Sequence, residues 1–232
     1  ATEDKIPELL AAGVNGVRLN LSHNTHAWHA KIIDKVRTAA KKLDRSVAIM
    51  WDLQGPKIRV GEVEGMVEVK AGDEIKFAEV GDGRLPQGVL PIQYNIAPHV
   101  KVGDRIMIRD GVITTEVTKV QNGVVTVAAK NAGKFGSNHG VNLPDTIFHG
   151  SKLTDKDMED VRFGLARDID YIVFSFVHTA EDIETLRGMI KKRKKKVRII
   201  TKIETKPATE NLHSIMMASD VVMIARGDLA LE

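Results

Sequence analysis

The chain has 232 residues, enough for one large domain or two smaller ones with a sizeable core. Its 43% hydrophobic and 28% charged residues are ordinary for a globular protein, and a net charge of +3 gives weak support for a nucleic-acid or membrane partner. The lack of cysteine excludes disulfides, thiolate metal sites and cysteine nucleophiles. No apolar run has the length of a membrane span, and no signal-peptide pattern opens the chain. We therefore expect neither a nucleic-acid nor a membrane partner, and a cytoplasmic location.

The first part of the sequence, to about residue 58, alternates short apolar strands with amphipathic helices. Thr2 is a candidate cap for the first helix. The segment GVRLNLS at 16–22 reads as a strand, Thr25 opens a second helix, and VAIMWD at 47–52 reads as the next strand. This order predicts strands joined by helical crossovers.

The same alternation resumes near residue 150. Thr154 with Asp157 and Thr179 with Asp182 have the spacing of capping boxes, so each pair predicts a helix start. Apolar strands separate and follow these helices; they are DYIVFSF at 170–176, VRIITKIE at 197–204 and VVMIAR at 221–226. Repeated units of this kind imply an α/β fold, with a parallel sheet or barrel and helices outside it.

The middle of the chain, about 60–145, has a different composition and a different hydrophobic pattern. It is rich in valine, glycine and aspartate, and its apolar residues alternate with period two. Asp110-Gly111 and Asn122-Gly123 are strong signals for two-residue hairpin loops. We therefore expect an all-β domain inserted between a strand and its helix.

Polar side chains gather where the predicted parallel strands end. The strand at 16–22 places Arg18, Asn20 and Ser22 on one face, although both faces of a parallel sheet are normally covered. Charged residues end three further strands; they are Asp52, Lys202 with Glu204, and Arg226 with Asp228. A single such residue is often only a cap or an ion pair, and a satisfied internal network is the structural alternative. Four convergent sets favour a functional site, because buried charges cost several kcal/mol unless they are paired or bind metal.

The residue types at these strand ends indicate phosphoryl transfer. Glu204 and Asp228 are hard oxygen ligands suited to Mg²⁺ or Mn²⁺. Lys202, Arg18 and Arg59 are cations suited to phosphate. Phosphoryl transfer needs this combination because the charge on the transferring group must be neutralised. The sequence has no Walker-type or G-x-G-x-x-G loop, so nucleotide binding requires another device.

Several motifs occur in the order found in pyruvate kinases; they are GVRLNLSH, DLQGPKIRVG, RDGVI, GVNLP, SFV, TKIE and ARGDLALE. The chain resembles that family over essentially its whole length. The resemblance implies a partial (β/α)8 barrel that lacks its first strand. Residues 1–58 would form its first part, 59–146 an inserted all-β lid, and 147–232 its continuation. It also implies transfer of phosphate from phosphoenolpyruvate to ADP, giving pyruvate and ATP, and a homotetrameric full-length parent.

The resemblance also assigns roles to individual residues. Glu204 and Asp228 look like ligands of an essential Mg²⁺, and Lys202 like the cation that stabilises the phosphoryl group and the enolate. Arg18 and Arg59 look like phosphate contacts. The positions that match nucleotide contacts are Asn20, His23, Arg59 and His139, although His139 stands where the family usually has lysine. The positions that match the cradle of the substrate carboxylate are Ala225, Arg226, Gly227 and Asp228. The proton-delivering threonine falls beyond residue 232.

Lys57 departs from the pattern of family members that need K⁺. In those members the ion is held by groups that match Asn20, Ser22, Asp52 and the carbonyl of Leu53. Those members usually have threonine, lysine and glutamate where this chain has Leu53, Gln54 and Lys57. This chain therefore resembles the branch that works without K⁺, and our hypothesis is that the Lys57 ammonium substitutes for the ion. At about 6 Å and an effective dielectric constant near 20, one unit charge contributes on the order of 3 kcal/mol. The alternative is a solvent-facing lysine in a turn.

Three further features receive structural interpretations. The run KKRKKK at 191–196 is expected to be a solvated helix end. His26 and His29 are expected to be a surface pair, because no acidic third ligand lies nearby in the sequence. Met216 and Met217 fit the core face of a helix.

Two other functions remain open from the sequence. One is a metal-dependent lyase or aldolase that acts on phosphoenolpyruvate or pyruvate on a barrel, which shares the carboxylate pair but needs no inserted domain. The other is an inactive truncated remnant or binding module. Both ends of the sequence look cut, which favours a piece of a longer protein.

Overall fold

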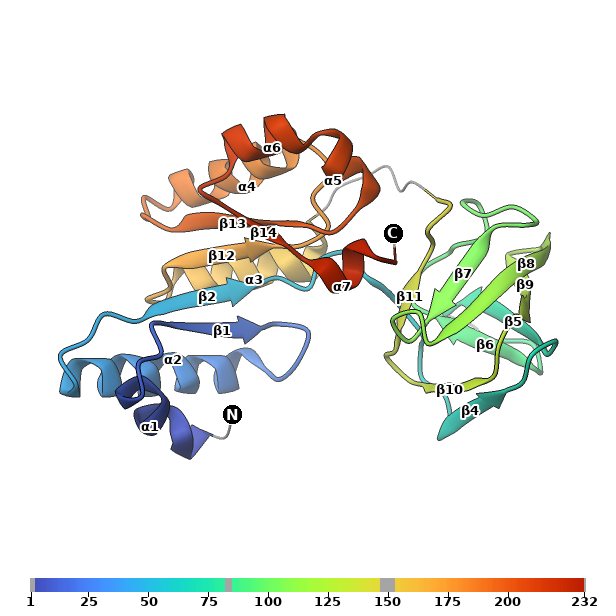
Figure 1. Cartoon of the computed structure of the whole chain (residues 1–232), viewed down its shortest axis with the longest axis horizontal. Helices are drawn as coiled ribbons and strands as arrows, with labels where there is room; N and C mark the ends of the chain where they lie inside the picture. Colours follow the sequence, from blue (N-terminus) through green and yellow to red (C-terminus); the bar gives the residue numbers. More distant parts are fainter. Residues whose placement is uncertain (1–2, 82–84, 147–152, 232) are drawn as a thin grey trace. The chain divides into compact units, whose positions relative to one another are not determined.

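The computed structural model describes residues 3–81, 85–146 and 153–231 (Figure 1). The chain divides into two compact units, one formed by Ala1–Pro56 with Ser151–Ala225 and the other by Lys57–Gly150 with Arg226–Glu232. Two sequence predictions, the Thr2 cap and the domain boundary at residue 147, lie outside the described residues.

The first unit is built on a five-stranded sheet in the order β1-β2-β12-β13-β14, with every neighbouring pair parallel. Its strands are β1 (Gly16–Asn20), β2 (Ala48–Asp52), β12 (Tyr171–Phe174), β13 (Arg198–Ile203) and β14 (Val221–Ile224). Its helical elements are η1 (Glu3–Lys5), α1 (Ile6–Ala11), α2 (His26–Lys42), α3 (Asp155–Leu165), α4 (Ala180–Lys192), α5 (Lys206–Glu210) and α6 (Leu212–Ala218). The predicted alternation of strands and helices, and with it the α/β class, is confirmed.

The helices α2, α3 and α4 begin at the positions that their capping residues predicted. Thr25 accepts a hydrogen bond from the backbone N–H of Trp28 at the start of α2. Thr154 and Asp157 form a complete capping box at the start of α3, and the corresponding box at Thr179 opens α4. Each box satisfies backbone donors that a helix start leaves without partners.

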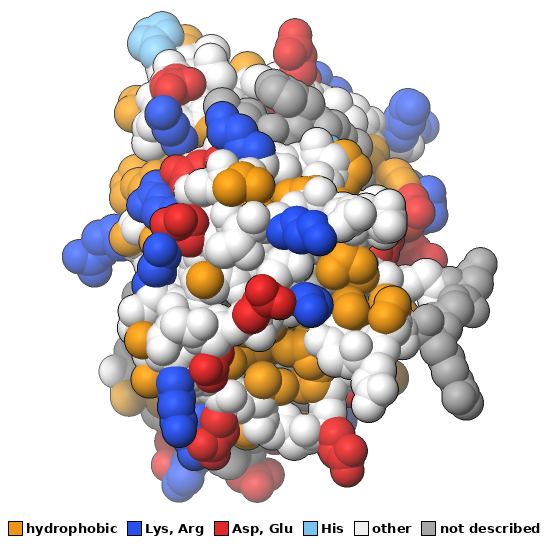
Figure 2. Space-filling model, turned by 90° about the vertical axis from the view of Figure 1, so that its right-hand side faces the viewer, with side chains coloured by type: hydrophobic (Ala, Val, Ile, Leu, Met, Phe, Trp, Pro, Cys, Tyr) orange, Lys and Arg blue, Asp and Glu red, His pale blue; other side chains and the backbone are white. Residues whose placement is uncertain are grey.

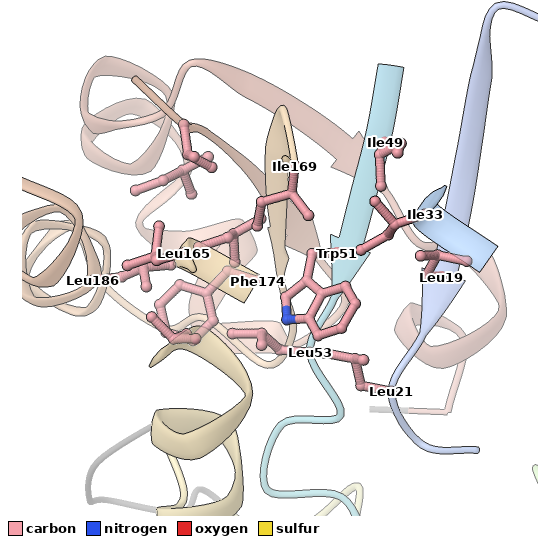
Figure 3. Packing of buried hydrophobic residues seen from close by; sticks show 14 of the residues in the cluster. Leu19, Leu21, Ile33, Ile49, Trp51, Leu53, Leu165, Ile169, Phe174 and Leu186 are labelled. Atoms are coloured by element: carbon pink, nitrogen blue, oxygen red, sulfur yellow. The ribbon is translucent and has the colours of Figure 1, made fainter. Parts of the chain in front are cut away.

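The core of the first unit lies between the sheet and its helices, and Figure 3 shows it from close by. Trp51 is fully buried there, and its indole N–H donates to the backbone carbonyl of Asp160 at 2.8 Å. Gly164 on α3 makes room for this ring, because a Cβ at that position would lie 2.7 Å from the indole nitrogen. A fully buried side chain of this size stabilises the fold by about 1.5–3 kcal/mol.

The second unit contains a seven-stranded sheet in the order β3-β11-β7-β8-β9-β5-β6 and a two-stranded sheet of β10 and β4. The strands are β3 (Ile58–Arg59), β4 (Met66–Val69), β5 (Glu74–Glu79), β6 (Val89–Ile92), β7 (Arg105–Ile108), β8 (Ile113–Gln121), β9 (Val124–Ala129), β10 (Gly133–Gly136) and β11 (Gly140–Asn142). A bridge between Val60 and Ile92 joins the two ends of the larger sheet. Every regular element in the described part of 57–146 is a strand, so the predicted all-β insertion is confirmed.

The two hairpin predictions have different outcomes. Asn122 and Gly123 form a two-residue loop with φ of 50° and 76°, as expected for a turn with two left-handed residues. Asp110-Gly111 instead lies inside a four-residue loop between β7 and β8, so the two-residue prediction is wrong there. Three successive residues, Arg109, Asp110 and Gly111, have positive φ, and the N–H of Val112 donates to the carbonyl of Arg109 at 3.2 Å, so the turn closes over four residues.

Two interpretations of surface and core positions are also wrong. Met216 and Met217 are 55% and 78% exposed, because the buried face of the short helix α6 is centred on Ile215. His29 is buried, and His26 pairs with Asp160, so the two histidines are not a surface pair. The sequence could not show that α3 covers this end of α2.

The charged surface is as mixed as the small net charge suggests. Residues 191–196 are exposed at the end of α4, which confirms the solvated helix end. Figure 2 shows lysine and arginine side chains interspersed with aspartate and glutamate over one face, with hydrophobic side chains between them. No helix within the described residues is both long and apolar enough to cross a membrane.

Candidate active site

The ends of β1 and β2 bring two predicted site residues together. The guanidinium Nε of Arg18 donates to Asp52 Oδ2 at 2.6 Å, although their positions are 34 residues apart in the chain. The Asp52 carboxylate is buried, whereas Arg18 is about half exposed. Within the described residues, Asp52 Oδ1 is buried without a hydrogen-bond partner. Such an oxygen is rare in native structures and suits a cation or another donor.

A second polar group connects the ends of β2, β12 and β13. The ammonium of Lys202 lies 3.0 Å from Glu204 Oε2 and donates to Ser175 Oγ at 3.0 Å. Ser175 in turn donates its hydroxyl hydrogen to the carbonyl of Leu53 at 2.7 Å. The predicted shared face of Lys202 and Glu204 is therefore confirmed as a direct contact. Ser175 was missed as a site residue, although a serine at the end of the apolar strand 170–176 was a usable signal.

The loop after β12 completes the environment of Glu204. Its Oε1 accepts the backbone N–H of Phe176 at 2.7 Å, and Phe176 has φ of 54°, which is uncommon for a bulky residue. Gly55 permits this arrangement, because a Cβ there would lie 2.9 Å from Ser175 Cβ. The Glu204 side chain is fully buried, and its ion pair with the Lys202 ammonium and its hydrogen bond from the Phe176 N–H offset the cost of burying a carboxylate.

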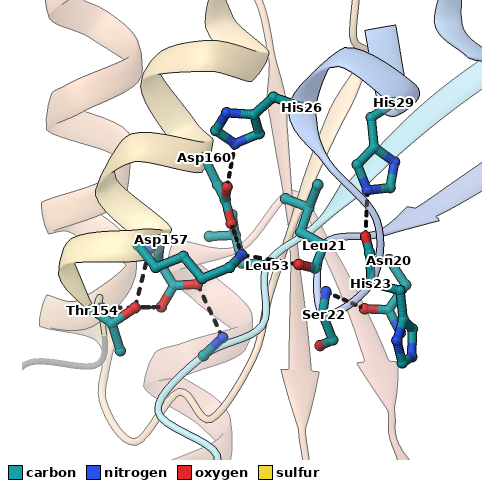
Figure 4. Close-up of polar contacts among 12 residues, drawn as sticks. Asn20, Leu21, Ser22, His23, His26, His29, Leu53, Thr154, Asp157 and Asp160 are labelled. Carbon is teal, nitrogen blue, oxygen red and sulfur yellow. Dashed lines mark hydrogen bonds and ion pairs between the residues drawn. The ribbon is translucent and has the colours of Figure 1, made fainter. Parts of the chain in front are cut away.

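The last residue of β1 and the loop between β1 and α2 provide three more candidate residues, and Figure 4 shows their contacts. Asn20 Oδ1 accepts the backbone N–H of Ser22 at 3.0 Å. The backbone carbonyl of His23 lies 2.8 Å from the Nε2 atom of His29. Asn20, Ser22 and His23 are therefore parts of one ordered turn.

The second unit holds the other candidates. The ammonium of Lys57 lies 2.8 Å from Asp228 Oδ1 and 3.0 Å from Asp110 Oδ1. Burial by itself lowers the pKa of Lys57, but the hydrogen bonds to Asp228 and Asp110 outweigh it, and the pKa is raised. Lys57 is therefore a paired cation and not a solvent-facing lysine. Arg59 donates to the carbonyl of Asn138 at 2.8 Å.

The remaining predicted residues have structural contacts of their own. His139 Nδ1 accepts the backbone N–H of Gly136 at 2.8 Å. Ala225 donates its N–H to the carbonyl of Ile203 at the end of β13. Arg226, Gly227 and Asp228 lie in the short helix α7 (Arg226–Leu229). Glu204 and Asp228 belong to different compact units, so their pairing in one metal site stays a prediction.

The described residues place few metal-binding side chains together, which suits a cation that needs few protein ligands. No group of three or more histidine, aspartate or glutamate side chains in the described part of the chain could hold a metal ion. Mg²⁺ is usually bound through one or two carboxylates, with water and substrate phosphates as its other ligands. The carboxylates of Glu204 and Asp228 are each paired with an ammonium, that of Lys202 and that of Lys57 respectively.

Comparison with known proteins identifies relatives along the whole chain. The family model described as pyruvate kinase, barrel domain, matches residues 1–232. The chain is 35% identical to a pyruvate kinase of Dictyostelium discoideum over 237 residues, which cover 100% of this chain and 47% of that protein. It is 34% identical to a pyruvate kinase of Staphylococcus aureus strain MRSA252 over 234 residues, which cover 100% of this chain and 40% of that protein.

The chain therefore spans less than half the length of the curated relatives it matches. The match to a barrel domain, together with the five parallel strands, makes the first unit part of a (β/α)8 barrel. The same similarity does not favour the lyase, aldolase or remnant readings.

Proposed function

Because this chain belongs to the pyruvate kinase family, we propose that the protein containing it transfers the phosphoryl group of phosphoenolpyruvate to ADP, giving pyruvate and ATP. The observation that carries this proposal is the buried contact of Lys202 with Glu204 at the end of β13. The proposal includes a cytoplasmic location and a homotetrameric full-length protein, as the family resemblance implies. In it, the all-β unit acts as a lid.

Lys202 is suited to stabilise the charge that the reaction moves. An ammonium has three N–H donors; in the described structure it donates to Ser175 Oγ and forms an ion pair with Glu204 Oε2 at 3.0 Å. A further N–H of Lys202 can donate to an oxygen of the transferring phosphoryl group or of the enolate. When the bond between phosphorus and the enol oxygen breaks, negative charge develops on that oxygen, and a fixed cation lowers the barrier. Protonation of the enolate carbon then gives pyruvate.

Mg²⁺ or Mn²⁺ is the divalent cofactor of this proposal, with Glu204 and Asp228 as its protein ligands. When bound, the ion neutralises charge on the phosphoryl oxygens. The chain's own residues prepare this site, because Lys202 and the Phe176 N–H orient the Glu204 carboxylate, and Lys57 orients that of Asp228.

The monovalent-cation position is proposed at Asn20, Ser22, Asp52 and the carbonyl of Leu53. The unpartnered Asp52 Oδ1 supports a positive charge there, whether from K⁺ or from an ammonium. We keep the hypothesis that Lys57 substitutes for K⁺, with its contacts to Asp110 and Asp228 as the fixed points of its ammonium.

The remaining assignments follow the family resemblance. Arg18, held by Asp52, and Arg59 would contact phosphate. Asn20, His23, Arg59 and His139 would contact the nucleotide. The backbone of Ala225, Arg226, Gly227 and Asp228 would receive the carboxylate of phosphoenolpyruvate.

The test is pyruvate formation by the full-length protein from phosphoenolpyruvate and ADP with Mg²⁺. K⁺ is titrated from zero in a Tris or tetramethylammonium buffer. Full activity without K⁺ supports both the reaction and the role of Lys57. Strong activation by K⁺ keeps the reaction and overturns the role of Lys57. No pyruvate under any condition overturns the proposed function.

A further inference from the structure

The β1–α2 loop, Leu21–Thr25, is short and has few hydrogen bonds within itself. The N–H of Leu21 donates to the carbonyl of Asp52 at 3.0 Å, which joins the start of the loop to β2. The loop then turns sharply, with Asn24 at φ of 64°. The backbone carbonyls of Leu21 and His23 accept hydrogen bonds from side chains of two helices, as Figure 4 shows.

Lys156 holds the loop from α3. Its ammonium donates to the carbonyl of Leu21 at 2.9 Å and to Asp160 Oδ2 at 2.6 Å. Asp160 is buried, and its other oxygen lies 2.6 Å from Nε2 of His26, whose ring stacks on Phe163. The carboxylate therefore has a fixed direction, and it directs the Lys156 ammonium at the loop.

His29 holds the loop from α2. Its Nε2 lies 2.8 Å from the carbonyl of His23, and since a carbonyl can only accept, this nitrogen carries the hydrogen. The imidazole is buried, with Trp28 and Trp51 packed against its ring at centroid distances of 5.0 and 5.5 Å. The ring has little freedom to leave the carbonyl.

We propose that Lys156 and His29 are positioning residues that hold the β1–α2 loop in the conformation in which Asn20 and His23 receive the nucleotide. Neither side chain needs to touch the substrate. Binding to a loop that is already ordered avoids the entropy cost of ordering it at that moment. This inference rests on the proposed function for the role of the loop, whereas the order of the loop can be measured without turnover.

The first experiment uses hydrogen–deuterium exchange of the full-length protein, followed in a peptide that covers residues 19–28. We expect Lys156→Met to raise the exchange rate of this peptide about tenfold, because it removes a charged donor from the Leu21 carbonyl. Lys156→Arg keeps a donor and should restore slow exchange. Lys191→Met is the matched control, since Lys191 is an exposed lysine at the end of α4.

The second experiment measures steady-state kinetics of the same variants. We expect Lys156→Met to raise KM for ADP about tenfold and to leave KM for phosphoenolpyruvate nearly unchanged. His29→Leu should also raise KM for ADP. His29→Gln keeps an N–H donor near the same place, so it should raise KM for ADP less. A uniformly destabilised protein would not separate the two substrates in this way.

The outcomes separate this inference from the proposed function. Unchanged exchange in both Lys156→Met and His29→Leu overturns the inference. So does faster exchange with an unchanged KM for ADP, or an equal rise of KM for both substrates. An unaltered full-length protein that forms no pyruvate overturns the proposed function instead, whatever the exchange rates are.

Discussion

The two compact units each contain a contact between a lysine and an acidic side chain, and the two contacts arise in different ways. Lys202 and Glu204 are two positions apart on one strand, so strand geometry alone brings them to one face. Lys57 and Asp228 are 171 positions apart, and only the folded chain brings them together. Glu204 is fully buried, whereas Asp228 is 28% exposed. We infer that loss of the first contact costs more than loss of the second, because the first leaves a fully buried carboxylate and the second a partly exposed one.

The largest effect should come from the first contact. Lys202→Met should lower kcat by about a thousandfold, because it removes the cation that faces the developing charge. Glu204 would then be buried with its ammonium partner missing, which costs about 3–5 kcal/mol of unfolding free energy. Steady-state kinetics and urea denaturation measure the two effects.

A double variant separates stability from chemistry at this contact. Lys202→Met with Glu204→Gln should recover much of the lost stability, since no buried charge is left without its partner, and should remain inactive. A Lys202→Met variant that keeps more than a tenth of the wild-type kcat would contradict the proposed role.

Loss of the second contact should lower activity less than loss of the first, and the size of this loss should depend on the K⁺ concentration. Lys57→Glu should lower activity about a hundredfold at zero K⁺, and added K⁺ should restore it, because the ion would supply the missing charge. Lys134→Glu is the matched control, because Lys134 is an exposed lysine of the same unit that pairs with Glu68. Equal K⁺ dependence of the Lys57→Glu and wild-type proteins would refute the substitution.

A third prediction concerns the pH dependence of the unfolding free energy and rests on His29 in the first unit. Burial lowers the pKa of His29, against the backbone hydrogen bond to His23 and the nearby Asp160, while His26 and Lys156 also lower it. The folded state therefore disfavours the charged imidazole, and stability is lost as pH falls below about 6.5, the unfolded value, towards the lowered folded value. Urea denaturation between pH 8 and pH 5 should show this slope.

The control for the pH effect is a side chain that does not titrate. His29→Gln keeps an N–H donor and should reduce the loss of unfolding free energy between pH 7 and pH 5. If the slope of the variant equals that of the wild type, the titration belongs to another group.

The smallest effect on stability is expected at Asp110, the more exposed of the two carboxylates that contact the Lys57 ammonium. Asp110 is 66% exposed, so Asp110→Asn should change the unfolding free energy by only about 0–1 kcal/mol. Added salt should reduce even this difference. A loss above about 2 kcal/mol would show that both carboxylates, and not Asp228 alone, hold the Lys57 ammonium.

Sequence reasoning succeeded where the deciding interactions are local. Capping boxes lie within four residues, and a strand repeats every two, so α3, α4 and the shared face of Lys202 and Glu204 could be predicted. It failed at Met216 and Met217, at the pair of His26 and His29, and at the Asp110-Gly111 loop. Each of these depends on which neighbouring element packs against the segment, and spacing along the chain carries no such information.

By itself, the sequence determined the α/β class, the all-β insertion, the helix starts and the polar strand ends, because alternation and capping are properties of short segments. The tertiary structure alone decided which of these ends meet. Ser175 reaches Leu53 across 122 positions, Lys156 reaches Leu21 across 135, and Lys57 reaches Asp228 across 171. These contacts exist because burial of the apolar core aligns strands and helices from distant parts of the chain, and the polar side chains then pair with what that packing places beside them.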